Sequence, residues 1–221
     1  MPSLFTIGHS NRTPETVLDM LIGASVDLLA DVRAFPRSRS NPAFNIDTFP
    51  KALAEHNIGY KHFERLGGRR KMHPSIDPAL NGYWRVQSFH NYADYALGDE
   101  FKAAIDEIEN LASDRHVALM CSEAVWWRCH RRIIADHLMA RGYHVCHLMA
   151  SGRQDTAEMT EGAVLRSADE VIYPEAKIDQ TSTGHIPLCR HERLAIRENE
   201  LRARRADQET RSRSSPEDWI S

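Results

Sequence analysis

Reactive side chains gather between Val117 and Gly142 of this chain. The segment reads as a short apolar strand, a polar turn and an amphipathic helix, and Cys121, Glu123 and Cys129 lie at the junction together with a histidine and three arginines. In an open α/β sheet, ligands bind outside the carboxyl ends of the strands. The junction is therefore where such a fold would place its functional site.

Cys121 directly follows the apolar run Val117–Met120 and precedes the predicted helix. A thiol in this position can meet backbone N–H groups and the positive end of the helix dipole, and both stabilise a thiolate. Arg128, His130 and Arg131 add positive charge and a second titratable group. Cys121 is thus a candidate nucleophile. The alternative is a small buried apolar residue, which free cysteine often is.

Glu123 and Cys129 extend the chemistry of this turn. Glu123 could act as a general base, orient an arginine or cap the helix. Cys129 lies eight residues after Cys121, whereas the paired cysteines of zinc sites are usually separated by about two to four residues. We therefore predict no cofactor. A zinc site made of Cys121, Cys129 and His130 stays open as an alternative, as does a packing or redox pair of the two cysteines.

Polar side chains also follow the first and second apolar runs of the chain. His9 and Ser10 come after the first run, and Asp31 and Arg33 lie at the end of the second. Because the carboxyl ends of parallel strands share one edge, we expect these residues to converge with Cys121. His9 is the best-placed histidine for proton transfer near neutral pH. A buried Asp31 needs a partner, which Arg33 would supply, and a purely structural ion pair is the alternative.

A flexible basic loop and two tryptophans complete the candidate site. Gly67 and Gly68 precede three cations at 69–71. Glycines let backbone N–H groups approach an anion, and the cations supply charge. Trp126 and Trp127 lie in the turn between the two cysteines, where they could wall the pocket or stack on a planar ligand.

The elements that must position these residues follow from the hydrophobic pattern. Five apolar runs predict strands, at Leu4–Ile7, Asp27–Val32, Ile58–Phe63, His116–Cys121 and Tyr143–Met149. Helices are predicted between them, at 13–22, 47–56, 89–111 (in two pieces broken at Gly98) and 129–140. Alternating strands and helices predict an α/β fold, an open, mainly parallel sheet of about five strands flanked by helices.

Length and composition fit one full-sized domain with an extension. The chain has 221 residues, of which 42% are hydrophobic and 27% charged. We place an α/β domain carrying the site at 1–150. A less regular C-terminal extension follows at 151–221, arginine-rich and partly disordered or helical, with one further short strand at 169–173.

Charge and cysteine usage narrow the class of protein. The net charge of -3 indicates no global field for a nucleic-acid or membrane partner. No run approaches the roughly 18 apolar residues of a membrane span, and the N-terminus shows no secretory signal. Four cysteines do not make a disulfide framework. We therefore expect a cytoplasmic protein. The sequence does not determine its oligomeric state.

These motifs together resemble domain-of-unknown-function family number 488. The resemblance covers roughly residues 3–150 and rests on Thr-Ile-Gly-His-Ser-Asn at 6–11, Leu-Ala-Asp-Val-Arg at 29–33 with Pro36, Leu-Gly-Gly at 66–68, and Cys121-x-Glu123 followed by Cys129-His130-Arg131. It implies a compact α/β domain and no particular reaction. The signature positions that it implies are His9, Ser10, Asp31, Arg33, Gly67, Gly68, Cys121, Glu123, Cys129, His130 and Arg131.

We expect an enzyme that acts on an anionic substrate, either a small phosphate-bearing molecule such as a nucleotide, or a nucleic acid. Arg33, Arg131 and the Gly-Gly loop would hold the anion. Glu123, Asp31 and His9 would move protons, with His130 as a further candidate. This reading accounts for reactive residues at a strand edge, which binding alone does not require.

Two alternatives remain open from the sequence. The first is a thiol enzyme of the sulfur-transfer or phosphatase-like kind with Cys121 as the nucleophile. The phosphatase loop, however, places an arginine six positions after its cysteine, and here that position is Trp127. The second alternative is a non-catalytic nucleic-acid-binding module, in which the basic loops contact phosphates and tryptophans stack on bases.

Overall fold

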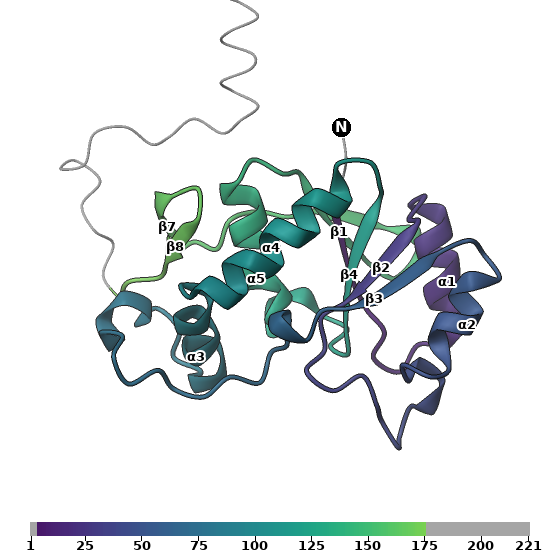
Figure 1. The fold of residues 1–221 in the computed structure, drawn as a ribbon, viewed down its shortest axis with the longest axis horizontal. Helices are drawn as coiled ribbons and strands as arrows, with labels where there is room; N and C mark the ends of the chain where they lie inside the picture. Colours follow the sequence, from purple (N-terminus) through teal and green to yellow (C-terminus); the bar gives the residue numbers. More distant parts are fainter. Residues whose placement is uncertain (1–3, 176–221) are drawn as a thin grey trace, which may run out of the picture. The chain divides into compact units, whose positions relative to one another are not determined.

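A six-stranded sheet forms the centre of the computed structural model, which describes residues 4–175 (Figure 1). Its strand order is β3-β2-β4-β1-β5-β6. The strands are β1 (Leu4–Gly8), β2 (Leu28–Asp31), β3 (Gly59–His62), β4 (Val117–Cys121), β5 (Val145–Leu148) and β6 (Gln154–Thr156). Strands β1 to β5 pair in parallel, and β6 is antiparallel to β5. The predicted α/β class is therefore confirmed.

Five helices flank the sheet: α1 (Pro14–Gly23), α2 (Phe49–Ala54), α3 (Gln87–Ala96), α4 (Asp99–Ala112) and α5 (Arg131–Ala140). Short 3-10 turns lie at Pro42–Phe44, Glu64–Leu66, Pro78–Asn81, Trp126–Arg128 and Ala150–Gly152. The start of α1 shows how local sequence sets these bounds. The Thr13 hydroxyl accepts a hydrogen bond from the Thr16 N–H, and Pro14 occupies the first helical position.

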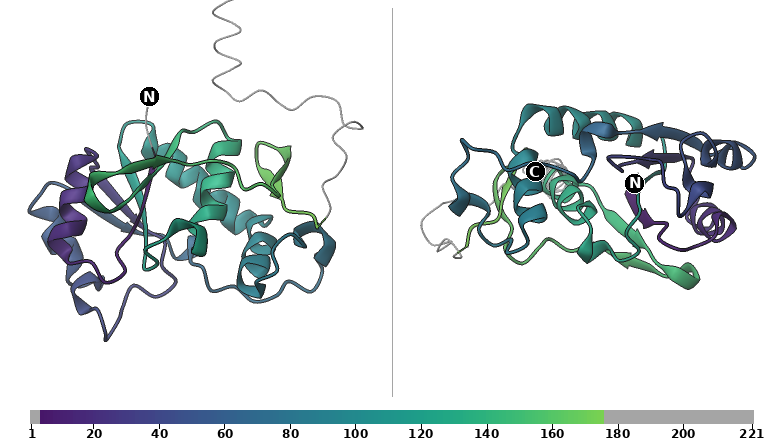
Figure 2. Two further views of the ribbon diagram at one scale, coloured as in Figure 1. Left: turned by 180° about the vertical axis from the view of Figure 1, so that it is seen from behind. Right: turned by 90° about the horizontal axis from the view of Figure 1, so that it is seen from below.

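The sheet separates two hydrophobic cores. Alternate residues of each strand face opposite sides, so Ala118 and Met120 pack with α1 and α2, whereas Val117, Leu119 and Cys121 pack with α3, α4 and α5. Figures 1 and 2 show α1 and α2 on one side of the strands and α4 and α5 on the other. Cys121 consequently faces the side of the sheet on which α5 begins.

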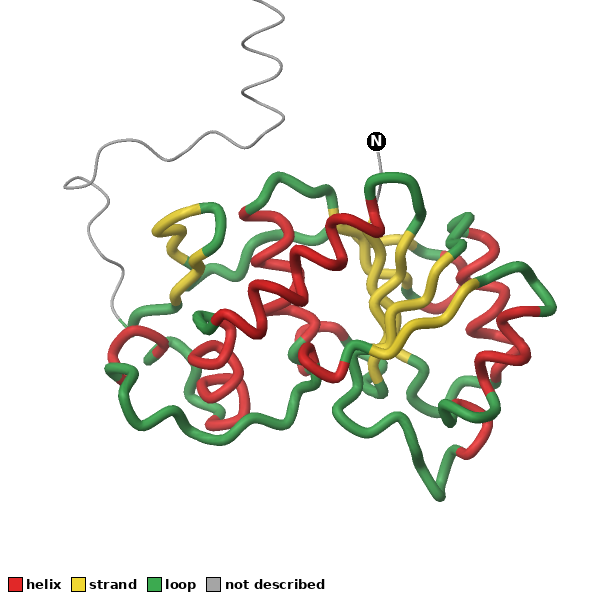
Figure 3. Tube along the Cα trace, in the orientation of Figure 1, coloured by secondary structure: helices red, strands yellow, loops and turns green. Residues whose placement is uncertain are grey.

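The neighbouring parallel strands β1 and β4 are followed by connections that run toward opposite edges of the sheet. After β1 the chain crosses toward the β3 edge, and after β4 it crosses to β5 on the other side of β1. Connections that leave two neighbouring strands in opposite directions open a crevice at their carboxyl ends, which is where open α/β sheets bind ligands. Long loops, green in Figure 3, follow β2 and β3 at the same edge.

The sheet continues past residue 150, where the sequence analysis ended the α/β domain. Strand β6 pairs with β5 through His147 and Asp155. The short strand expected at 169–173 is β8 (Glu170–Ile172), and it forms a hairpin with β7 (Val164–Ser167) apart from the main sheet. The arginine-rich segment Arg190–Arg213 lies outside the described residues. No helix in residues 4–175 is long and apolar enough to cross a membrane.

A buried carboxyl group joins this hairpin region to α5. Asp136 accepts hydrogen bonds from the Thr160 N–H and from the Tyr173 hydroxyl, both at 2.9 Å. Burial raises the pKa of Asp136 to about 6 despite these donors. The segment after β6 therefore holds α5 in place, and α5 carries residues of the site at its N-terminus.

Three buried histidines should make the stability of the protein depend on pH. Burial lowers the pKa of His137 to about 3, and burial first, then nearby arginine charge, lowers the pKa values of His9 and His147 to about 4. An unfolded chain binds these protons from about pH 6.5 downward. Because the folded state binds fewer protons, the free energy of unfolding should fall as the pH drops from about 6.5 toward 4.

His137→Leu should reduce this loss by about 1.4 kcal/mol for each pH unit in that window. Chemical unfolding at pH 7.0, 6.0 and 5.0 measures the effect. Asp136 changes stability in the opposite direction over part of this range, so the comparison is between variants rather than absolute values. The exposed His56→Leu is the matched control. An equal pH dependence in His137→Leu and wild type would contradict the prediction.

Candidate functional site

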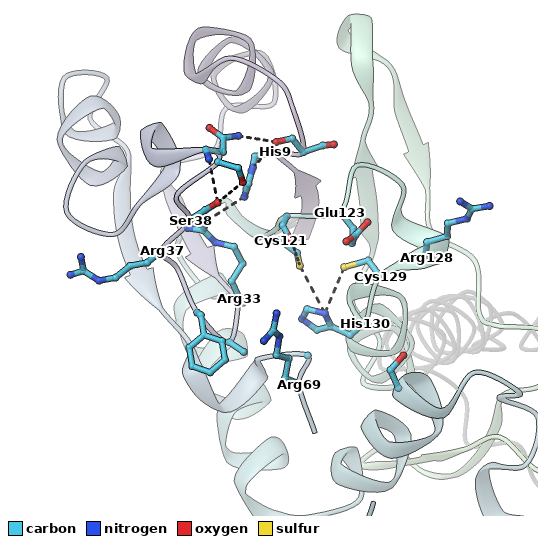
Figure 4. Close-up of a pocket in the computed structure, with 18 of the residues that line it drawn as sticks. His9, Arg33, Arg37, Ser38, Arg69, Cys121, Glu123, Arg128, Cys129 and His130 are labelled. Carbon is cyan, nitrogen blue, oxygen red and sulfur yellow. Dashed lines mark hydrogen bonds between the residues drawn. The ribbon is translucent and has the colours of Figure 1, made fainter. Parts of the chain in front are cut away.

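A cavity of about 490 Å³ lies at the carboxyl edge of the sheet, at the crevice between β1 and β4 (Figure 4). Eight candidate site residues from the sequence line it: His9, Ser10, Arg33, Gly68, Cys121, Glu123, Cys129 and His130. Five others do not line it: Asp31, Gly67, Trp126, Trp127 and Arg131. The expected convergence of the strand ends is thus observed, although the members take different roles.

Asp31 and Arg33 form a buried ion pair at the end of β2. The Arg33 Nε donates to Asp31 Oδ1 at 2.8 Å, and its Nη2 donates to Asp31 Oδ2 at 2.5 Å. The Tyr60 hydroxyl donates to the same carboxylate at 2.7 Å, and Arg33 Nη2 also donates to the Phe44 carbonyl. These contacts hold the guanidinium in one orientation. Asp31 therefore positions Arg33 and has no exposed surface from which to move a substrate proton.

His9 is held neutral beside this pair. Arg33 Nη1 lies 3.2 Å from His9 Nε2, and His9 Nδ1 lies 3.1 Å from the Ser10 carbonyl. An arginine only donates, so Nε2 accepts and Nδ1 carries the proton. Burial, and then the charge of Arg33, lower the pKa of His9 to about 4. The role in proton transfer expected near neutral pH does not fit this environment. The ring instead stacks on Phe44, with centroids 4.3 Å apart.

Cys121, Cys129 and His130 form the floor of the cavity. The His130 Nδ1 lies 3.9 Å from Cys121 Sγ and 3.7 Å from Cys129 Sγ (Figure 4). On the other side of the ring, Nε2 donates to the Val32 carbonyl at 3.0 Å. This hydrogen bond places the proton on Nε2 of the neutral ring. The lone pair of Nδ1 therefore points at the two sulfur atoms.

The two thiols have opposite pKa shifts. Burial acts to raise the pKa of Cys129, but hydrogen bonding with Cys121 and the charge of Arg131 lower it to about 6. Hydrogen bonding with Cys129, and then burial, raise the pKa of Cys121 to about 12. The sequence analysis made Cys121 the candidate thiolate, whereas these shifts favour Cys129. Besides Cys121, the group that lowers the pKa of Cys129 is Arg131, whose Nε lies 3.3 Å from Cys129 Sγ.

Arg131, the first residue of α5, is only 1% exposed and lies beneath the cavity. Its Nη2 donates to the Glu123 carbonyl at 2.5 Å and its Nη1 to Thr6 Oγ1 at 3.4 Å. Within residues 4–175 it has no carboxylate partner at salt-bridge distance. The Cys129 thiolate is therefore its counter-ion, and Arg131 holds the site together rather than the substrate.

Comparison with known proteins identifies the domain. The family model "Domain of unknown function DUF488" matches residues 13–138, more than half of the chain. The protein belongs to the DUF488 family. No curated protein and no solved structure matches the chain significantly.

Three glycines allow close approaches within the site. A Cβ atom on Gly8 would lie 1.8 Å from the Glu123 carbonyl oxygen, and one on Gly68 would lie 2.5 Å from His130 Nδ1. A Cβ on Gly67 would lie 2.7 Å from the Cα of Ala34. Gly67 and Gly68 thus allow close packing against Ala34 and His130, respectively. The sequence analysis missed Gly8, whose signal was its place at the carboxyl end of the first strand.

The tryptophans turn away from the cavity. Trp126 stacks on His147, with ring centroids 4.4 Å apart, and Trp127 packs edge-on against Trp126. Two phenylalanines line the cavity in their place, Phe35 and Phe89. The sequence analysis missed both. Phe35 is 67% exposed in the irregular loop after β2, and its signal in the sequence was an aromatic residue among polar ones.

The backbone and the side chain of Glu123 have separate roles. Its carbonyl oxygen binds Arg131, while its exposed side chain lines the cavity on the same side as Cys129 (Figure 4). Among the cavity-lining residues it is the only carboxylate. It therefore stays a candidate proton acceptor.

Gly8→Ala should destabilise the protein by about 3 kcal/mol or more, because the added Cβ would overlap a backbone carbonyl that cannot move without displacing Arg131. Gly23→Ala is the matched control, since nothing lies within 4 Å of its added Cβ. In a helix this change should leave stability unchanged or raise it by about 0.5–1 kcal/mol. Denaturant unfolding of both variants measures the difference, and equal stabilities would contradict it.

Proposed function

We propose that this DUF488 protein is an enzyme that acts on an anionic, phosphate-bearing substrate bound in the cavity between the β1 and β4 ends. One observation carries the proposal. Four arginines, Arg33, Arg37, Arg69 and Arg128, line the cavity against a single carboxylate, Glu123. Clefts lined by one sign of charge attract ligands of the opposite sign.

The arginines differ in how much of their charge is available. Asp31 neutralises Arg33, which leaves it as an oriented hydrogen-bond donor. Arg37 forms an exposed ion pair with Asp47 at 2.9 Å. Arg69 has no carboxylate partner within the described residues, and Figure 4 shows its side chain close to His130. Arg128 also has no carboxylate partner within residues 4–175, but Figure 4 shows its guanidinium pointing away from His130 and the two cysteines. Arg69 is therefore the residue that we expect to contribute most to binding an anion.

The remaining lining favours a nucleotide over a simple anion. Ser10, Ser38 and Asn41 offer short polar side chains of the kind that bind phosphate and sugar oxygens. Phe35 and Phe89 line the same cavity, and the guanidinium of Arg69 lies 5.4 Å above the Phe35 ring. Aromatic and arginine planes together are typical surfaces for stacking a base.

The position of the reactive groups favours an enzyme over a binding module. Cys121, Cys129, His130 and Glu123 all line the cavity that the arginines line. The pKa values of the two cysteines are strongly shifted, and such groups in a cleft are typical of active sites. A thiol enzyme remains the second candidate because two cysteines reach the cavity. Its signature would be a covalent adduct on either thiol after incubation with substrate, detected by peptide mass.

Arg69→Met should weaken the binding of nucleoside monophosphates and of inorganic phosphate by at least about tenfold, the loss expected for a charge-assisted hydrogen bond. Isothermal titration calorimetry measures the affinities. Arg166→Met is the matched control, since Arg166 is an exposed arginine paired with Glu170 on the β7–β8 hairpin. Unchanged affinity in Arg69→Met, or no binding by wild type, would contradict the proposal. Tight binding of DNA or RNA with a steep salt dependence and no turnover would favour the binding module instead.

A further inference from the structure

We propose that Cys121, Cys129 and His130 bind a zinc ion, and that its remaining coordination position faces the cavity. The three ligand atoms, two Sγ and one Nδ1, all lie within 4.8 Å of one another. Two thiolates and an imidazole form one of the ligand sets that zinc uses in enzymes. The proposed substrate of this zinc rests on the function proposed above, whereas the metal site itself does not.

The distances are close to those of a bound ion. Bonds of about 2.3 Å to sulfur and 2.0–2.1 Å to nitrogen at tetrahedral angles place the sulfur and nitrogen ligands roughly 3.5 Å apart. Here Nδ1 lies 3.7 Å from Cys129 Sγ and 3.9 Å from Cys121 Sγ. The two nitrogen–sulfur distances would have to shorten by only a few tenths of an ångström, and the two sulfur atoms lie within 4.8 Å of each other.

The groups around the three ligands have the arrangement that metal sites require. A histidine that binds a metal usually donates its other N–H to a carbonyl or carboxylate. His130 does so, to the Val32 carbonyl, and thereby presents an unprotonated Nδ1. Arg131 Nε donates to Cys129 Sγ, a bond that also stabilises a metal-bound thiolate. Gly68 leaves room for the ring, because a Cβ there would lie 2.5 Å from Nδ1.

An ion pair between Arg131 and Cys129 explains less of this geometry than a bound zinc ion does. Arg131 needs only the Cys129 thiolate as a counter-ion. It explains neither the second thiol nor an imidazole nitrogen aimed at both sulfurs. A zinc ion accounts for all three groups at once. Two thiolates neutralise the charge of a zinc ion, and Cys129 Sγ can accept the hydrogen bond from Arg131 Nε while it binds the metal.

Three protein ligands leave the ion with an open position, as in catalytic rather than structural zinc sites. The metal-ligand group found within residues 4–175 has no fourth member, and its three members all line the cavity. Water bound there would lose a proton near neutral pH. Glu123 is the carboxylate placed to accept it. The resulting hydroxide would attack an electrophilic centre of the substrate, and the bond to the leaving group would break as that group takes up the proton.

The test is the metal content of the full chain, purified without a histidine tag and under reducing conditions. We expect zinc at close to one equivalent, measured by mass spectrometry of the elements. After removal of zinc with a chelator, Co²⁺ alone should give the thiolate charge-transfer absorption of a tetrahedral cysteine site, and Zn²⁺ should displace it. Reduced wild-type protein that binds Zn²⁺ no better than buffer, or shows no thiolate–cobalt absorption, overturns the proposal.

Substitutions assign the site. Cys129→Ser and His130→Gln should each lower Zn²⁺ affinity more than about 100-fold, beyond the effect of outer-shell changes. Cys146→Ser is the matched control, because Cys146 Sγ also lies near a histidine, 3.6 Å from His144 Nδ1, but without a second thiol. Glu123→Gln should also keep full zinc content. Unchanged affinity in both ligand variants overturns the proposal, and if they do not fold, the wild-type cobalt spectrum decides it.

The two proposals fail in different ways. Zinc binding without any affinity for phosphate would leave the metal site and remove the proposed function. Phosphate binding that depends on Arg69 in a protein without zinc affinity would leave the proposed function and remove the metal site. Each measurement is made without the other ligand.

Discussion

The buried guanidinium of Arg131 is the interaction on which the site depends. It joins Thr6 of β1, the Glu123 carbonyl in the loop after β4, and Cys129 at the start of α5. A buried charge is tolerated only when it is paired and hydrogen-bonded. The hydrogen bonds to Arg131 therefore fix the positions of these groups, and with them the position of Cys129 in the cavity. Gly8 belongs to the same constraint, because any side chain there would strike the Glu123 carbonyl.

A second buried arginine has a different counter-charge. Arg33 is satisfied by the carboxylate of Asp31. Arg131 is satisfied by a thiolate. A thiolate is a soft ligand and a nucleophile, so its pairing with an arginine leaves it available to a metal ion or to a substrate. The two pairs thus have different roles. The Asp31–Arg33 pair presents an oriented hydrogen-bond donor, and the Cys129–Arg131 pair stabilises a reactive sulfur.

Topology brings these pairs together. The connections after β1 and β4 leave in opposite directions, so the loops at their ends part and leave a cavity between them. Residues far apart in the sequence, such as His9, Arg33 and Cys121, then share one wall. The cavity is rich in arginine although the net charge of the chain is -3. Local charge, rather than total charge, is what a bound anion would experience.

The sequence by itself determined the α/β class, the five parallel strands and the reactive part of the cavity lining, because hydrophobic periodicity is local and parallel strands share one carboxyl edge. Only the tertiary structure decided which thiol ionises, why His9 is neutral and where the tryptophans point. Those properties depend on contacts across the fold, such as Arg33 to His9 and Trp126 to His147. A pKa depends on burial and neighbouring charge, and residue types alone determine neither.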